Sequence, residues 1–128
     1  MASIAVFDSS AVLAVLKNER GVAVVYPLLR GGQIGTVNLA EVHELLLRYG
    51  MPPGAAWMQI LGLGLEICPF TPEQARMAAE LTATTRPYGL SLGDRACLAL
   101  AIDRKATVYT ADRAWKELGL GVEVEVIR

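Results

Sequence analysis

The sequence predicts an α/β fold in which helices cover both faces of a mostly parallel central sheet of four to five short strands. Short apolar runs rich in β-formers alternate along the chain with segments of helical length, a pattern typical of such sandwiches. No internal repeat, low-complexity tract or linker interrupts the 128 residues, of which 53% are hydrophobic. We therefore expect residues 1–128 to form one domain around one core.

Two strands and two helices are predicted in the first part of the chain. Ser9 and Ser10 offer capping hydroxyls to the first helix. Gly31 and Gly32 are expected to stop the second. The elements are a strand over 2–7, a helix over 11–16, a helix over 22–29 and a strand over 34–37.

Capping and proline signals divide the middle of the chain. Asn38 is predicted to open a helix that ends at Gly50. Pro52 and Pro53 start the next helix, and Thr71 followed by Pro72 places proline at a first helical position. The elements are a helix over 38–49, a helix that starts at 52–53 and runs to about 61, a strand over 65–70, and a helix from 72 to about 84.

The remaining residues repeat the alternation of helix and strand. An almost wholly apolar helix is expected over 92–104, since polar residues are few on any of its faces. It is followed by a strand over 107–109, a short helix over 111–118 and a last strand over 122–127.

Composition excludes several classes of protein. A mean hydropathy of +0.38 excludes a disordered chain. Twelve Lys and Arg against thirteen Asp and Glu give a net charge of −1, which argues against a domain that binds nucleic acid by bulk positive charge. Cys68 and Cys97 lack the spacing of a zinc site or a disulfide framework. No apolar stretch reaches the ~18 residues of a membrane span, so we expect a cytoplasmic protein.

Four carboxylates fall where predicted strands pass into predicted helices, at Asp8, Glu41, Asp94 and Asp112. The chain has four aspartates, and three of them belong to this set. Ligands of such sheets bind beyond the carboxyl ends of the strands. We therefore expect the four acids to converge at that edge.

Each acid also has a structural interpretation as a helix-capping residue. The spacings from Asn38 to Glu41 and from Ser91 to Asp94 both fit a capping box, and acids in a first turn complement the helix dipole. For Asp94 the helical period favours a site instead, because Asp94 shares an apolar face with Cys97. A buried carboxylate needs a partner or a metal ion.

Neighbouring acids provide a comparison. Asp103 lies on the opposite side of the helix from Asp94, and Glu44 points away from the apolar stripe that Glu41 flanks. We expect both to be surface charges. For Glu41 and Asp112, each taken alone, capping is the favoured interpretation.

Four carboxylates without a matching Lys or Arg would repel one another. A divalent cation is the natural compensation, and ligation by oxygen alone suits Mg²⁺ or Mn²⁺. Such ions activate water and stabilise phosphoryl displacement. Phosphodiester hydrolysis therefore explains the set best.

The four acids sit in four short motifs, ordered along a stretch from about Ile4 to Ile127. The motifs are Val6-Phe7-Asp8-Ser9-Ser10-Ala11, Asn38-Leu39-Ala40-Glu41-Val42, Leu90-Ser91-Leu92-Gly93-Asp94-Arg95-Ala96 and Val108-Tyr109-Thr110-Ala111-Asp112. In order and spacing they resemble the motifs of PIN-domain nucleases, and among these the VapC-type toxins of prokaryotic toxin–antitoxin pairs.

The resemblance implies a PIN-like α/β/α sandwich and a Mg²⁺- or Mn²⁺-dependent endoribonuclease. Asp8, Glu41, Asp94 and Asp112 would be its catalytic and metal-binding acids, with Thr110 as a supporting polar neighbour. The resemblance also implies an RNA substrate, a cognate antitoxin protein that covers the acidic site, and a homodimer. Apolar helices over 55–61 and 12–16 are the candidate interfaces.

Two other functions remain open. One is a module of the same fold that holds metal or RNA without cutting it. The other is a phosphotransfer domain of receiver or haloacid-dehalogenase type, which needs a second acid close to the first strand end, where Asp8 is followed by two serines. His43 is expected to be a packed or surface imidazole, since it has no histidine partner. Arg86, Arg95 and Arg113 could meet RNA phosphates or form surface salt bridges.

Overall fold

The computed structural model describes residues 3–128. Five strands form one all-parallel sheet in the order β3-β2-β1-β4-β5. The strands are β1 (Ala5–Phe7), β2 (Gln33–Gly35), β3 (Glu66–Cys68), β4 (Thr107–Thr110) and β5 (Glu123–Val126). The predicted α/β class with a parallel central sheet is confirmed. Ala2, which was placed in the first strand, lies outside the described residues.

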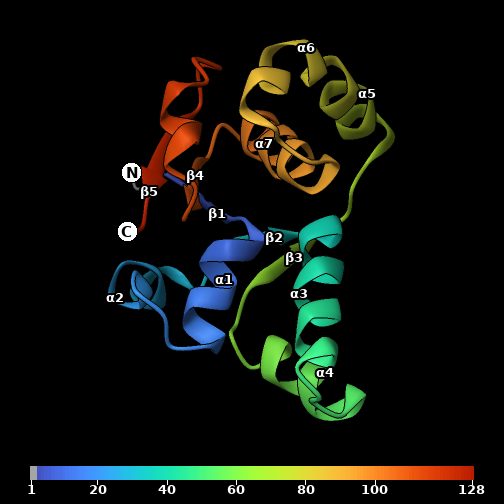
Figure 1. The fold of residues 1–128 in the computed structure, drawn as a ribbon, viewed down its shortest axis with the longest axis vertical. Helices are drawn as coiled ribbons and strands as arrows, with labels where there is room; N and C mark the ends of the chain where they lie inside the picture. The colour runs from blue at the N-terminus through green and yellow to red at the C-terminus, as the bar shows by residue number, and fades with distance from the viewer. Residues whose placement is uncertain (1–2) are drawn as a thin grey trace.

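Helices cover both faces of this sheet. In Figure 1, α1 and α2 lie on one side of the strands, and α5, α6 and α7 lie on the other. The first set is α1 (Ser9–Leu16), α2 (Val22–Val25), the 3₁₀ helix η1 (Tyr26–Leu28), α3 (Thr36–Arg48) and α4 (Pro53–Leu61). The second is α5 (Pro72–Glu80), α6 (Thr82–Thr85), the 3₁₀ helix η2 (Arg86–Tyr88), α7 (Leu92–Arg104) and the 3₁₀ helix η3 (Arg113–Glu117).

The central strand β1 divides the core into two parts. Phe7 packs in a cluster with the buried side chains of α1, α2 and α3, whereas Val6 packs with α7. This is the alternation of side-chain direction that a strand imposes. Helix α7 is buried from Ala96 to Ala101, as its almost wholly apolar sequence predicts. Strand β1 is therefore held on both faces, and the residue that follows it is rigidly placed.

Several predicted boundaries are wrong, for local reasons. The helix predicted over 22–29 is split into α2 and η1 at Pro27, whose nitrogen has no hydrogen to donate. The helix predicted from 72 to about 84 breaks at Leu81 into α5 and α6. The helix predicted over 111–118 is the shorter 3₁₀ helix η3. The helix predicted over 92–104 has the predicted bounds. The helix expected to start at Pro52 and Pro53 begins at Pro53, with Pro52 as its N-cap.

Within residues 3–128, no helix combines the length and the apolar character that crossing a membrane requires. Cys68 and Cys97 are buried free thiols.

Candidate active site

The parallel sheet brings the segments that follow its strands to one edge. Phe7 pairs with Tyr109 in neighbouring strands, so the next residues, Asp8 and Thr110, come to lie side by side. Both are buried: Asp8 is 4% exposed and Thr110 is 0% exposed. The carboxylate of Asp8 is therefore buried at the carboxyl end of β1, where α1 begins.

Three hydrogen bonds hold the carboxylate of Asp8. Its Oδ1 accepts from Ser10 Oγ at 2.7 Å and from the backbone nitrogen of Ala11 at 2.9 Å, and its Oδ2 accepts from Thr110 Oγ1 at 2.6 Å. Asp8 is thus the N-cap of α1. The prediction that Ser9 and Ser10 cap this helix is wrong, because the helix begins directly after Asp8 and takes both serines into its first turn.

The surroundings of Asp8 disfavour its charge. Burial raises the pKa of this carboxyl from 3.8 to about 6, although the hydrogen bonds from Ser10, Thr110 and Ala11 oppose the change. The negative charge of Asp94 adds to the increase in pKa. An acid that is costly to ionise by itself is one that a bound cation would stabilise.

Glu41 reaches the same edge from α3. Its Oε1 accepts from Ser9 Oγ at 2.6 Å and from Asn38 Nδ2 at 2.9 Å. The prediction that Asn38 opens this helix is wrong: α3 begins at Thr36, with Gly35 as N-cap, and Asn38 is turned inward and 2% exposed. The predicted strand over 34–37 ends correspondingly early, at Gly35.

Asp94 lies in the first turn of α7 and forms a capping box. Its Oδ2 accepts from the backbone nitrogen of Ser91 at 2.9 Å, and its own nitrogen donates to Ser91 Oγ at 3.2 Å. The argument from helical period against capping is therefore wrong for Asp94, which is half-buried and caps the helix while lining the site. Burial raises the pKa of Asp94, and the charges of Glu41 and Asp112 raise it further.

Asp112 is the fourth acid, and its side chain is exposed. Its Oδ1 accepts from the backbone nitrogen of Ala114 at 3.0 Å, so it caps η3, as the structural interpretation of Asp112 alone predicts. Its backbone nitrogen donates to Thr110 Oγ1 at 3.0 Å. The hydroxyl of Thr110 therefore connects Asp8 and Asp112, in keeping with its predicted place beside the acids.

The four acids line one hollow of about 460 Å³, and no Lys, Arg or His shares that lining. The remaining lining residues are Ser9, Ser10, Leu13, Leu45 and Ala111. The carboxylates do not converge on a point: among residues 3–128, no three acidic, His or Cys side chains are arranged to hold a metal ion. Each acid is instead held by nearby donors. The donor chemistry, oxygen alone and uncompensated negative charge, fits a hard divalent cation.

The acids expected at the surface are exposed. Glu44 is exposed and paired with Arg48. Asp103 is exposed too, but it accepts a 3.0 Å hydrogen bond from Nε2 of the buried Gln74. Glu44 is therefore the better control for the site, because changing Asp103 would disturb a buried amide.

The other candidate side chains lie outside the hollow. His43 packs against Trp57 with ring centroids 5.4 Å apart, as expected for a packed imidazole. Arg95 donates to the carbonyl of Ala78 at 2.8 Å and so braces α5 against α7. Arg86 and Arg113 are exposed.

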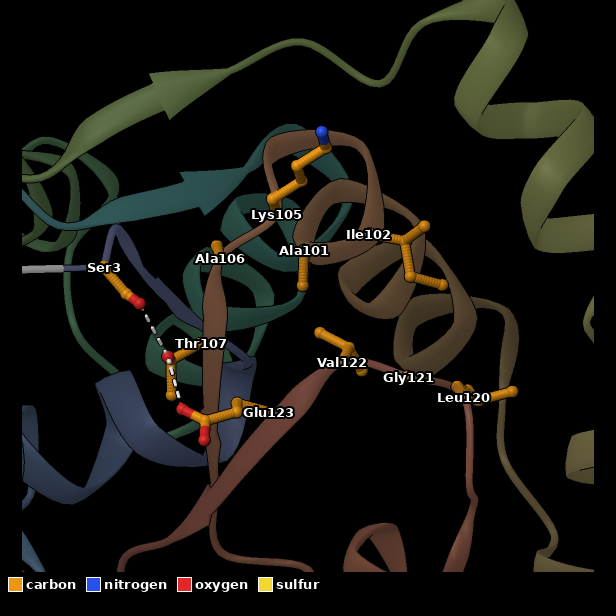
Figure 2. A pocket seen from close by; sticks show the side chains of 10 residues that line it. All are labelled: Ser3, Ala101, Ile102, Lys105, Ala106, Thr107, Leu120, Gly121, Val122 and Glu123. Atoms are coloured by element: carbon orange, nitrogen blue, oxygen red, sulfur yellow. Dashed lines mark hydrogen bonds between the residues drawn. The ribbon is translucent and has the colours of Figure 1, made fainter.

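A second hollow, of about 230 Å³, lies at the opposite end of the sheet, where β4 and β5 begin. Figure 2 shows a chain of hydrogen bonds across it, from Ser3 Oγ to Thr107 Oγ1 at 3.1 Å and from Thr107 Oγ1 to Glu123 Oε2 at 3.5 Å. The amine of Lys105 points away from the cavity. The side chains of Ser3, Thr107 and Glu123 hydrogen-bond to one another, so this second hollow shows no sign of a ligand site.

Sequence reasoning did not assign a role at the site to Ser9, Asn38 or Gly93. Ser9 and Asn38 were assigned as caps, and only the long-range packing of α1, α3 and α7 turns them toward Glu41. The close approach of Gly93 to Glu41 had no local sequence signal.

Comparisons with known proteins agree with this fold. The sequence model of the PIN domain family matches residues 5–120. The chain belongs to the PIN domain family. No protein with curated annotation matches the sequence.

Several solved structures with the same fold come from toxin–antitoxin systems. VapBC2 from Rickettsia felis, bound to a promoter DNA fragment, is similar with a TM-score of 0.73 and 16% identity, over 96% of this chain and 98% of that one. A toxin–antitoxin complex from Klebsiella pneumoniae is similar with a TM-score of 0.74 and 18% sequence identity, over 97% of this chain and 98% of that one. VapBC-5 from Mycobacterium tuberculosis is similar with a TM-score of 0.65 and 22% sequence identity, over 98% of each chain.

Proposed function

We propose that this protein is a Mg²⁺- or Mn²⁺-dependent endoribonuclease and the toxin of a type II toxin–antitoxin pair. One observation carries the proposal: four carboxylates line a single hollow at the carboxyl edge of the sheet, without a cationic side chain in its lining. The choice of RNA and of the toxin class rests on the resemblance of the four motifs to VapC-type toxins. The toxin–antitoxin complexes among its structural neighbours support the choice of the toxin class.

Asp8, Glu41, Asp94 and Asp112 would hold the cation. A divalent ion bound there supplies a Lewis acid and an activated water for attack on the phosphodiester phosphorus. Asp8, at the buried base, would be the fixed ligand, because three hydrogen bonds already orient its two oxygens. Thr110 would keep Asp8 oriented, in the way that outer partners orient metal ligands.

A non-catalytic module that binds metal or RNA is the second candidate. The observation that favours it is the separation of the acids, since no three of them in residues 3–128 are placed to share an ion. Cation binding by the nuclease would require the acids to move closer together, while Asp94 and Asp112 could keep their capping hydrogen bonds, since each uses only one carboxylate oxygen for its cap. The two candidates differ in one measurable property, cleavage of the phosphodiester bond.

The experiment is cleavage of a structured RNA by the purified protein in Mg²⁺, in Mn²⁺ and in EDTA. Wild type and Glu44→Gln should cut in either cation and not in EDTA, whereas Asp94→Asn should not cut. Glu44 is a matched control, because it is a solvent-exposed acid on the same helix as Glu41. RNA binding without cleavage in every cation would favour the non-catalytic module.

We also propose that the chain pairs with a second copy and with an antitoxin. Of the two predicted interfaces, the 12–16 segment packs largely against the core, with Val12 and Ala14 fully buried. Helix α4 instead exposes Trp57, Met58 and Leu61 at 37%, 67% and 46%. Apolar side chains gathered at one surface are typical of an interface. A monomeric mass by light scattering at tens of micromolar would contradict the dimer.

A basic segment of the antitoxin would suit the acidic hollow, because its cationic side chains would compensate the same carboxylates as the metal. Replacing the Arg and Lys residues of that segment by Ala should weaken inhibition of cleavage. Unchanged inhibition would show that the antitoxin does not anchor in the hollow.

A further inference from the structure

We propose that Asn38 and Gly93 are positioning residues that fix the carboxylate of Glu41 against the first turn of α7. The proposal rests on the proposed function, since it assigns these residues to the same acidic site. Asn38 lies one turn before Glu41 on α3, and Gly93 directly precedes Asp94. Together they would set where Glu41 stands relative to Asp94, although the two acids belong to different helices.

Asn38 joins the two helices through its side-chain nitrogen. Asn38 Nδ2 donates to Glu41 Oε1 at 2.9 Å and to the backbone carbonyl of Gly93 at 3.1 Å. Ser9 Oγ, 3.3 Å from the same nitrogen, reinforces the contact by donating to Glu41 Oε1 at 2.6 Å. One buried amide therefore ties α3 to α7 at the point where Glu41 enters the hollow.

The orientation of this amide follows from its neighbours. A carboxylate and a backbone carbonyl can only accept hydrogen bonds, so the nitrogen of Asn38 must face them. Its Oδ1 is then buried, with no hydrogen-bond partner among residues 3–128. A buried acceptor without a partner lowers stability. The side-chain amide of Asn38 thus leaves one acceptor unpaired, at a cost in stability, and directs its two N–H groups at the carboxylate of Glu41 and at the carbonyl of Gly93 in α7.

Gly93 leaves the space that the Glu41 carboxyl group occupies. A Cβ built on Gly93 would lie 2.6 Å from Cδ and 2.7 Å from Oε1 of Glu41, and closer still to Oε2. The backbone at Gly93 is not in the left-handed region, so its conformation alone admits any residue. What excludes a side chain is the carboxyl group of Glu41.

The substitution Gly93→Ala separates positioning from stability. Alanine favours a helix over glycine, and the far end of the Glu41 side chain can move aside. We expect Gly93→Ala to keep or raise the melting temperature of the metal-free protein while displacing Glu41. Gly54→Ala is the matched control, since Gly54 is also the second residue of its helix, α4, and a Cβ there meets nothing within 4 Å.

Three readouts on the full chain test the proposal. In the metal-free protein, the side-chain amide protons of Asn38 should exchange with solvent faster in Gly93→Ala than in wild type. The rise in melting temperature caused by Mn²⁺ alone should shrink. RNA cleavage should fall about 10–100-fold, the range for residues that orient metal ligands. Gly54→Ala should match wild type in all three.

The double variant Gly93→Ala/Glu41→Asp tests whether Gly93→Ala lowers cleavage through Glu41. Aspartate is one methylene shorter, which removes the clash with the new methyl group, so the double variant should cleave as Glu41→Asp does. Independent effects that multiply would show that Gly93 does not act through Glu41.

The outcomes separate this proposal from the proposed function. A wild type that responds to Mn²⁺ but cuts no RNA would overturn the nuclease and leave positioning supported if Gly93→Ala still weakens the response. Positioning is overturned if Gly93→Ala and Gly54→Ala give the same amide exchange and the same Mn²⁺ response. It is also overturned if wild type shows no Mn²⁺ response at all.

Discussion

The hydroxyl of Thr110 donates a 2.6 Å hydrogen bond to Oδ2 of Asp8, across two neighbouring parallel strands. Oγ1 of Thr110 also accepts a hydrogen bond from the backbone nitrogen of Asp112 at 3.0 Å. A single buried hydroxyl therefore orients the deepest acid of the site and fixes the start of the segment that carries the outermost acid. Its donor role lowers the pKa of Asp8 against the effect of burial.

Thr110→Val should weaken cleavage about 10–100-fold at neutral pH, as loss of an outer partner of a metal ligand does. Valine has nearly the shape of threonine but donates no hydrogen bond, so the pKa of Asp8 should rise above about 6. The pH at which cleavage is half-maximal should move upward with it. Thr110→Ser keeps the hydroxyl and should restore the wild-type profile, and an unchanged profile in Thr110→Val would contradict this role.

Asp8→Asn should raise the stability of the metal-free protein at pH 7.5 while slowing cleavage by at least about 100-fold. The difference between a pKa of 3.8 and one of about 6 corresponds to an upper limit of about 3 kcal/mol for the cost of the buried charge. Asparagine can keep the acceptor that Ser10 and Ala11 use. Urea denaturation in EDTA measures the gain, and a less stable variant at this pH would contradict the account.

The same pKa sets the pH dependence of wild type. Because the native pKa of Asp8 lies above 3.8, the folded state binds the proton more tightly than the unfolded state. The stabilising contribution of protonated Asp8 is complete below about pH 3.8 and is lost as the pH rises through about 6. The stability advantage of Asp8→Asn should therefore shrink as the pH falls from 7.5 to 4.5, and a constant advantage would rule this cause out.

The fold could be predicted where sequence patterns are local. The apolar helix over 92–104 was predicted with its observed bounds, and the proline start of α4 was predicted within one residue, since their signals lie within the segments themselves. The start of α3 was not predictable in this way. Asn38 has the identity of a cap, and only its burial between α3 and α7, a tertiary effect, turns it toward Glu41.

Much of the site could also be predicted, because parallel strands bring their carboxyl ends to one edge. The four acids do line one hollow there. Capping and lining were treated as alternatives for Asp94, whereas the structure has both at once. The separation of the four carboxylates from one another could not be predicted, since it depends on hydrogen bonds such as that from the backbone nitrogen of Ala114 to Asp112.

Millimolar Mn²⁺ should raise the melting temperature of wild type by binding the native state alone. At a free concentration 100-fold above Kd the gain is about 2.7 kcal/mol, on the order of 10 °C for a domain of this size. Glu44→Gln should show the same increase, and Asp94→Asn a smaller one. Equal increases in Asp94→Asn and wild type would place the ion outside the hollow.

Arg86 and Arg113 should contribute to RNA affinity rather than to the chemical step. Both are exposed, take part in none of the ion pairs within residues 3–128, and lie on the segments next to Asp94 and Asp112. Replacing either by Gln in the Asp8→Asn background should flatten the plot of log affinity against log salt by about 0.7 for each lost contact with single-stranded RNA. Arg48→Gln on α3 is the control, and an unchanged slope would exclude phosphate contacts by these side chains.

Analysis of the RNA ends left by cleavage in Mn²⁺ tests the central claim most directly. Attack by water leaves no 2′,3′-cyclic phosphate, whereas attack by the ribose 2′-hydroxyl, the route of metal-independent ribonucleases, does. We predict that wild type and Glu44→Gln cut a labelled RNA only when Mn²⁺ or Mg²⁺ is present, without cyclic ends, and that Asp8→Asn is slower by at least about 100-fold, beyond the range for residues that only support a metal ligand. Cleavage that persists in EDTA, yields cyclic phosphates or survives Asp8→Asn would contradict the account.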